Sequence, residues 1–284
     1  MYVALCGGQQ RDFEWDSRTQ GLVHSAFFYG FTASQAPGGW LAGRVGGSKL
    51  FGLAIGGASL LSLMTPSVAR AGVRPLLATR ALEGLAAGVA HPSLDALWPL
   101  WAPPLERGRL VSFAVAGYGA GMVAALLPSG YVAARFGWPW VFYLSGSLGL
   151  LWSVLWWLCA RSRPGLCGGI SPEELAYITE SLGHSRGAPQ VVAYPWCSIA
   201  TSAPVWAGVA AIFVGSWNYY TLAAQLPTYM RDVLCFDLGR AGALAAVPYM
   251  AVVLVVPAAG RGADWLLIRG LGITQASIHL SLCI

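Results

Sequence analysis

The chain has 284 residues, of which 56% are hydrophobic and only 10% are charged, and its mean hydropathy is +0.58. A soluble domain carries about 25% charged residues, so this composition excludes an ordinary water-soluble fold. The net charge of +5 comes from dispersed basic residues and not from a basic run, which argues against nucleic-acid binding and fits loop arginines beside a membrane. We therefore expect an all-α membrane protein.

The N-terminal segment, residues 1–20, lacks a basic start and has too short an apolar run for a signal peptide. We interpret it as lying outside the membrane. Apolar windows of about 20 residues, the length that crosses a bilayer, follow it in seven places. The predicted helices cover 21–43, 50–68, 75–99, 110–132, 139–160, 204–229 and 240–260. Residues 265–284 resemble the start of an eighth helix but end before a full span.

The predicted helices fall into two groups. Five of them form one bundle at 21–160, and 204–284 begin a second bundle. The polar stretch 161–203 between them is predicted to be a cytoplasmic linker, on the side with slightly more basic residues. Within it, SPEELAYITESL fits a short amphipathic surface helix. Ser171 is placed as its N-cap, with Pro172 first and Glu174 third, which is a capping-box arrangement.

The third predicted helix carries polar side chains in an otherwise apolar sequence. At 100° per residue, Arg80 and His91 lie about 20° apart, with Glu83 and Asp95 about 60° to either side. Arg80 and Glu83, three residues apart, are able to pair directly. Two interpretations stay open. Either the pair is structural and His91 and Asp95 are interfacial, or Arg80 attracts an anionic substrate while Glu83, His91 and Asp95 relay protons, since ionisable groups inside a membrane face cavities and partners.

The same helix contains a proline and two spaced glycines. Pro92 is predicted to kink it between His91 and Asp95. Gly84 and Gly88, four residues apart, predict close packing against a neighbouring helix.

Two other predicted helices carry isolated polar residues. His24 precedes Tyr29 by five residues in the first helix, and it is either interfacial or a proton carrier. In the sixth helix, Asn218 and Gln225 share a face suited to a polar cavity. The aromatic run around them, which includes Tyr220, is more typical of packing or of an interfacial belt.

Enzyme chemistry finds little support. The sequence contains no P-loop, zinc-protease, EF-hand or G-x-S-x-G pattern, and its six cysteines show no C-x-x-C pair. We therefore expect no metal site, no disulfide scaffold and no cofactor, and we treat an intramembrane enzyme as the weakest alternative.

Longer segments carry a family resemblance. They are WDSRTQGLVHSAFFYGFTASQAPGGWLAGRVGGSK, RALEGLAAGVAHPSLDALWPLWAPPLERGRL, GWPWVFYLSG and PVWAGVAAIFVGSWNYYTLAAQLPTYMRDVL. Together they resemble the solute carrier 17 family, organic-anion transporters of the major facilitator superfamily, and the branch that carries sialic acid with protons looks nearest. The resemblance covers roughly residues 13–268, and WAPPLER at 101–107 is its most specific motif.

The resemblance implies a partial major facilitator fold, with family helices two to eight present. It also implies symport of a small organic anion, sialic acid or an acidic amino acid, with protons or sodium. The expected location is a multi-pass position in a lysosomal, synaptic-vesicle or plasma membrane, with lipid around it and no nucleic acid as a partner. The hypothesis assigns substrate binding to Arg80, Tyr29, Asn218 and Tyr220, and proton coupling to Glu83, Asp95, His91 and His24.

Several positions depart from the family pattern. Ala87 stands where most relatives carry a second Glu, Asp95 replaces their usual His, and Gly215 replaces an Arg of the glutamate-type members. The last change argues against vesicular glutamate transport, and the first predicts that proton coupling is lost or moved to Asp95. The family's first helix and last helices are also absent. The alternative function is therefore a truncated, non-transporting isoform or fragment, which we expect to associate with full-length copies.

Overall fold

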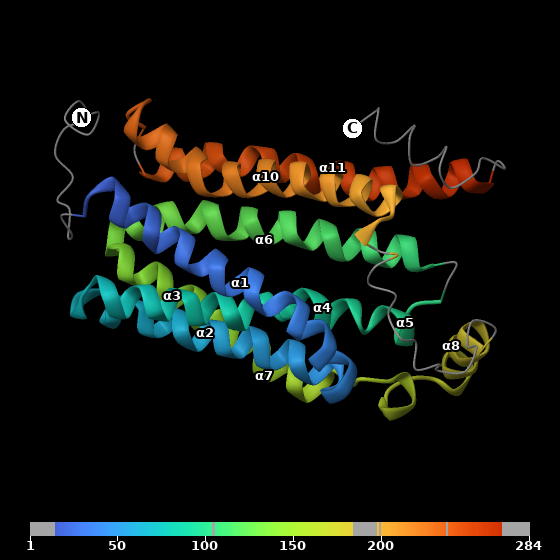
Figure 1. Cartoon of the computed structure of the whole chain (residues 1–284). Helices are drawn as coiled ribbons and strands as arrows, with labels where there is room; N and C mark the ends of the chain where they lie inside the picture. The colour runs from blue at the N-terminus through green and yellow to red at the C-terminus, as the bar shows by residue number, and fades with distance from the viewer. Residues whose placement is uncertain (1–14, 104–105, 184–197, 199, 237, 269–284) are drawn as a thin grey trace.

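The computed structural model describes residues 15–103, 106–183, 198, 200–236 and 238–268. Six long helices occupy six of the seven predicted positions and run side by side in Figure 1. They are α1 (Ser17–Val45), α2 (Gly47–Ala71), α6 (Arg107–Phe136), α7 (Trp138–Cys159), α10 (Ala203–Asp232) and α11 (Leu238–Ile268). Three of the junctions fall at Gly46, Gly72 and Gly137, which have positive φ of 99°, 135° and 93°. Glycine adopts these angles without the steric cost that a Cβ brings, so it ends one helix and starts the next.

Four segments are long and apolar enough to cross a membrane: Gly47–Ala71, Arg107–Phe136, Trp138–Cys159 and Gly242–Ala259 within α11. Helices α1 and α10 have 29 and 30 residues, which is sufficient length. Their polar residues, among them His24, Asn218 and Gln225, make them less apolar than these four. Two helices that carry polar candidates, α1 and α10, thus have a weaker membrane signal than these four segments.

The third predicted helix is divided into α3 (Val73–Gly88), α4 (Ala90–Asp95) and α5 (Trp98–Trp101). Proline lacks the N–H that would bond to the carbonyl four residues earlier, and its ring clashes with that carbonyl. Pro92 acts in this way on Gly88, and Pro99 acts on Asp95. The prediction placed the kink between His91 and Asp95, and this position was wrong. The break lies at Val89, on the N-terminal side of Pro92.

Between α7 and α10 lies the predicted amphipathic helix, α8 (Pro172–Gly183). The Ser171 hydroxyl accepts a hydrogen bond from the Glu174 backbone N–H at 3.1 Å, which confirms the predicted N-cap. The Tyr177 hydroxyl donates to Glu106 Oε1 at 3.1 Å and ties α8 to the segment before α6. This hydrogen bond to a carboxylate raises the pKa of Tyr177. Residues 184–197 of the predicted linker lie outside the described residues.

Glycines allow the closest helix contact, between α1 and α3. A Cβ at Gly84 would collide with the carbonyl oxygen of Phe27, and one at Gly88 with that of Phe31. The predicted close packing at these two glycines is confirmed.

Helices from distant parts of the sequence form two other contacts. Between α2 and α7, the Ser153 hydroxyl donates to the Gly52 carbonyl and the Trp156 indole donates to the Ser48 carbonyl, each at 2.9 Å. Helix α6 packs along α11, and α10 lies beside α11 (Figure 1). The first five predicted helices are thus joined to the last two mainly through α6 and α11.

Candidate functional site

An ion pair lies inside the helix bundle on α3. The Arg80 Nη1 atom donates to Glu83 Oε2 at 2.9 Å, and the two side chains are 23% and 11% exposed. It is the one ion pair found among the described residues, and it confirms the pairing that their i,i+3 spacing predicted. An ion pair at this depth is neutral overall, which lowers the cost of placing two charges in a membrane.

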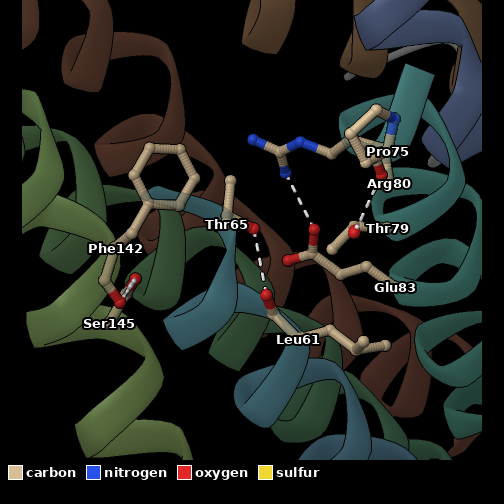
Figure 2. A network of polar contacts seen from close by, with 8 residues as sticks. All are labelled: Leu61, Thr65, Pro75, Thr79, Arg80, Glu83, Phe142 and Ser145. Atoms are coloured by element: carbon tan, nitrogen blue, oxygen red, sulfur yellow. Dashed lines mark hydrogen bonds and ion pairs between the residues drawn. The ribbon is translucent and has the colours of Figure 1, made fainter. Parts of the chain in front are cut away.

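The groups around the pair leave it free to bind something else. The Arg80 guanidinium lies over the Phe142 ring of α7, 5.2 Å from its centroid. Figure 2 shows that the nearby hydroxyls of Thr79 and Thr65 donate to carbonyls of their own helices, each at 3.0 Å. They therefore do not compete for Glu83. A guanidinium has five N–H donors, and Glu83 is its one hydrogen-bond acceptor among the described residues.

Helix α1 contributes a histidine near this pair. The charge of Arg80 acts on the imidazole of His24, so the structure brings together three of the predicted residues: His24, Arg80 and Glu83. Tyr29 of the same helix is 71% exposed. The residue before it, Phe28, faces the second half of the chain instead.

His91 belongs to a separate cluster. Its imidazole stacks on the Tyr118 ring of α6 at 5.2 Å and 12°, and it meets the Phe31 ring of α1 edge-on at 5.9 Å. The charge of Asp95 acts on Tyr118 as well. Among the described residues, no hydrogen bond, ion pair or ring contact joins this cluster to Arg80 and Glu83. The predicted single stripe is thus two sites, because His91 comes eleven residues after Arg80, about 16 Å further along the helix axis.

Aromatic side chains of α10 connect these clusters to α11. The Tyr220 ring packs edge-on against Phe28 of α1 at 5.3 Å, and Tyr219 packs against Tyr249 of α11 at 5.4 Å. The Tyr249 hydroxyl donates to the Tyr219 carbonyl at 3.3 Å. Asn218 is exposed on α10.

Two residues of this aromatic layer, Phe28 and Tyr118, were not predicted as site residues. Phe28 stands next to Tyr29 in the sequence FFYG, and the prediction selected Tyr29 instead of Phe28. Tyr118 lies in the apolar sequence AGYGAG, where no local pattern singles out a tyrosine that contacts α4.

The sequence matches known proteins along most of its length. The profile of the Major Facilitator Superfamily matches residues 3–283. Sialin from Homo sapiens and sialin from Ovis aries are each 41% identical over 254 residues, which are 89% of this chain and 51% of the relative. Vesicular glutamate transporter 1 from Xenopus tropicalis is 38% identical over 261 residues, which are 91% of this chain and 45% of the relative. The chain spans about half the length of the curated relatives it matches.

Fold and sequence thus agree. The described residues form helices, four segments are apolar enough to span a membrane, and the superfamily profile covers almost the whole chain. These findings confirm an integral membrane protein with a partial major facilitator fold. With its similarity to sialin and to the vesicular glutamate transporters, this chain belongs to the solute carrier 17 family of the major facilitator superfamily.

Proposed function

We propose that the chain is the part of a secondary active transporter that binds a small organic anion and couples its movement to protons. The observation that carries this proposal is the ion pair of Arg80 and Glu83, 2.9 Å apart and mostly buried on α3. Sialic acid and acidic amino acids are the proposed substrates, because sialin and the vesicular glutamate transporters are relatives by sequence. A lysosomal, synaptic-vesicle or plasma membrane is the proposed location.

Charge balance supports the coupling. With Glu83 ionised, the pair is neutral. With Glu83 protonated, Arg80 keeps a charge that costs several kcal/mol at membrane depth unless an anion joins it. A carboxylate substrate restores neutrality and forms two parallel hydrogen bonds to the guanidinium. The two low-energy states are therefore the empty site without the proton and the occupied site with it, which is the condition for symport.

The neighbouring groups have secondary roles in this proposal. His24 lies within reach of the Arg80 charge and is suited to pass protons to Glu83. The aromatic contact of Phe28 with Tyr220 places α10 against α1, so Tyr220, with Asn218 and Tyr29, is proposed to line the path of the substrate. Because Ala87 removes one acidic position, Asp95 beside His91 and Tyr118 is the second proposed proton group.

The test is uptake of labelled sialic acid, aspartate and glutamate into proteoliposomes that contain the 284-residue chain. We expect an inwardly directed proton gradient to drive uptake, and Arg80→Gln to lower it by about tenfold or more, because one charge-assisted bidentate contact contributes about 1.5–3 kcal/mol. Glu83→Gln fixes the neutral state, so we expect exchange of substrate without dependence on the gradient. Arg74→Gln, an exposed change at the start of the same helix, is the matched control.

Three other results have distinct meanings. Uptake driven equally well by a sodium gradient would replace the proton as coupling ion. Uptake that survives Arg80→Gln would contradict the assigned site. Absence of uptake, together with stable co-purification with a full-length relative, would favour the alternative of a non-transporting isoform, since the chain spans about half the length of those relatives.

A further inference from the structure

A group of basic residues lies at the opposite end of α2 from its junction with α3. Arg44 and Lys49 flank the α1–α2 turn, and Arg161 and Arg163 follow the end of α7. All four are exposed. We call these four residues the basic cluster.

Two turns that are distant in sequence form this cluster. A Cβ placed on Gly46 would lie 3.1 Å from the Ser162 hydroxyl oxygen, so the α1–α2 turn touches the residues after α7. The hydrogen bond from the Trp156 indole to the Ser48 carbonyl, at 2.9 Å, fixes the two helix ends to each other. Figure 1 shows both ends on the same side of the bundle. The four basic residues therefore belong to two segments that meet at one contact, and not to one loop.

No acidic side chain neutralises the basic cluster. Among the described residues, none of its four members forms an ion pair. The Arg161 guanidinium donates to the carbonyls of Trp157 and Ala160, at 3.4 and 3.2 Å, and these are neutral acceptors. The N-terminus of α2 begins within the cluster without a side-chain cap, and its backbone dipole adds partial positive charge. The site is thus suited to an anion.

The surroundings indicate which anion. The Arg44 guanidinium lies 4.1 Å over the Trp40 ring, which is 61% exposed. In the last turn of α7, Trp157 and Leu158 expose 46% and 66% of their surfaces, and toward the middle of the helix Leu151 and Leu155 expose 57% and 51%. A ligand that binds here contacts positive charge at the helix ends, then an aromatic side chain, and then the exposed apolar side chains of α7. That order matches a lipid from headgroup to acyl chain, with tryptophan at the interface.

We propose that the basic cluster binds the phosphate group of an anionic phospholipid, whose acyl chain lies along the exposed face of α7. The general excess of basic residues on one side of a membrane protein accounts for their number but not for their convergence from two turns. Anionic lipids attract Lys and Arg near the membrane surface, and this site holds four of them around one contact. The proposal does not rest on transport activity.

The experiment places the purified 284-residue chain in nanodiscs of phosphatidylcholine with a minority of phosphatidylglycerol. Native mass spectrometry then counts the lipids that each protein molecule retains. We expect phosphatidylglycerol to be enriched over phosphatidylcholine. We expect Arg44→Gln/Lys49→Gln and Arg161→Gln/Arg163→Gln each to reduce that enrichment, by roughly fivefold for each charge removed.

Matched controls separate this site from general charge effects. Arg70→Gln/Arg74→Gln removes the same number of charges at the α2–α3 turn, where both arginines are exposed, and it should leave the enrichment unchanged. The conservative variant Arg44→Lys/Arg161→Lys/Arg163→Lys should retain it, because charge is kept. Helix content by circular dichroism identifies any variant that fails to fold, and the two separate double variants keep the test valid if one does.

The proposal is overturned by any of three results. These are no enrichment in the unchanged chain, an equal loss in the Arg70 and Arg74 control, or displacement of phosphatidylglycerol by excess inorganic phosphate. The last result would show a site for free anions and not for a lipid. Retention against inorganic phosphate, with loss only in the cluster variants, would establish the lipid site.

Discussion

At the scale of residues, Arg80 and Glu83 show what one charged pair requires in a membrane. Their three-residue spacing brings the two side chains into contact within a single helix, so the pair forms whatever the rest of the fold does. Its surroundings come from other helices, with Phe142 over the guanidinium and His24 within range of its charge. The three-residue spacing thus brings Arg80 and Glu83 together, and the packing of other helices places Phe142 and His24 around them.

The cap at the start of α1 predicts a pH effect at this scale. The Asp16 carboxylate accepts a hydrogen bond from the Thr19 N–H at 3.0 Å, which lowers the pKa of Asp16. Its contribution to stability is present above the pKa of an unfolded aspartate, about 3.9, and is lost as the pH falls through the lower folded value. We expect the protection of amide hydrogens at the start of α1, measured relative to their intrinsic exchange rate at each pH, to fall over that range.

Two variants check this explanation. Asp16→Asn keeps a capping oxygen but does not titrate, so its protection, relative to the intrinsic exchange rate, should be nearly independent of pH over the same range. Asp16→Ala should show weak protection at every pH. A pH dependence that persists in Asp16→Asn would assign the effect to another group.

At the scale of elements, proline and glycine determine how the helices are divided and how closely they approach. Pro92 divides the third predicted helix at Val89, and His91, in α4, stacks on Tyr118 of α6. Gly84 and Gly88 let α3 meet the backbone of α1. Pro37, in contrast, lies inside α1, which continues through it, so the position of a proline relative to its neighbours decides its effect.

Pro92→Ala tests the origin of the break. Alanine restores an N–H that can bond to the Gly88 carbonyl, so α3 and α4 should join into one helix. We expect slower hydrogen exchange over residues 86–95 and a loss of the contact between His91 and Tyr118, measured as a changed imidazole resonance of His91. Pro37→Ala, in the unbroken α1, should change neither quantity. Unchanged exchange in Pro92→Ala would show that tertiary packing holds the break.

At the scale of the whole molecule, α6 and α11 join the two groups of helices. Gly119 of α6 lies against α11, where an added Cβ would stand 3.0 Å from Val253 Cγ2 and 3.2 Å from the Tyr249 carbonyl oxygen. Ala245, Ala246 and Tyr249 of α11 are almost fully buried. Small residues let these helices approach closely, which is how helices associate where lipid removes most of the hydrophobic driving force.

Gly119→Val is expected to weaken the contact between α6 and α11. The new side chain meets backbone and branched side chains that have little room to move, and overpacking of this kind costs about 1–3 kcal/mol. We expect a lower thermal midpoint in detergent and faster proteolysis between α10 and α11. Gly121→Val is the matched control, because nothing lies within 4 Å of a Cβ at Gly121. Equal destabilisation by both variants would mean that the cost is intrinsic to α6 and not to its contact with α11.

The sequence by itself determined the features that depend on neighbours along the chain. Apolar windows set the positions of the helices, i,i+3 spacing set the pair of Arg80 and Glu83, and the pattern SPEE set the Ser171 cap. The superfamily followed from motifs carried in the same segments. Each of these needs only one helix or one turn, so no knowledge of the packing was required.

Only the tertiary structure decided which distant side chains meet. The projection of Arg80, His91 and Asp95 onto one face gave their direction on the helix but not their neighbours, and His91 meets Tyr118, 27 residues later in the chain. Phe28 likewise meets Tyr220, and the α1–α2 turn meets the residues after α7, which brings the segments of Arg44 and Arg161 together. Apolar helices of similar composition can pack in many orders, so hydrophobic periodicity does not specify partners, whereas the close fit of glycines and aromatic rings between helices does.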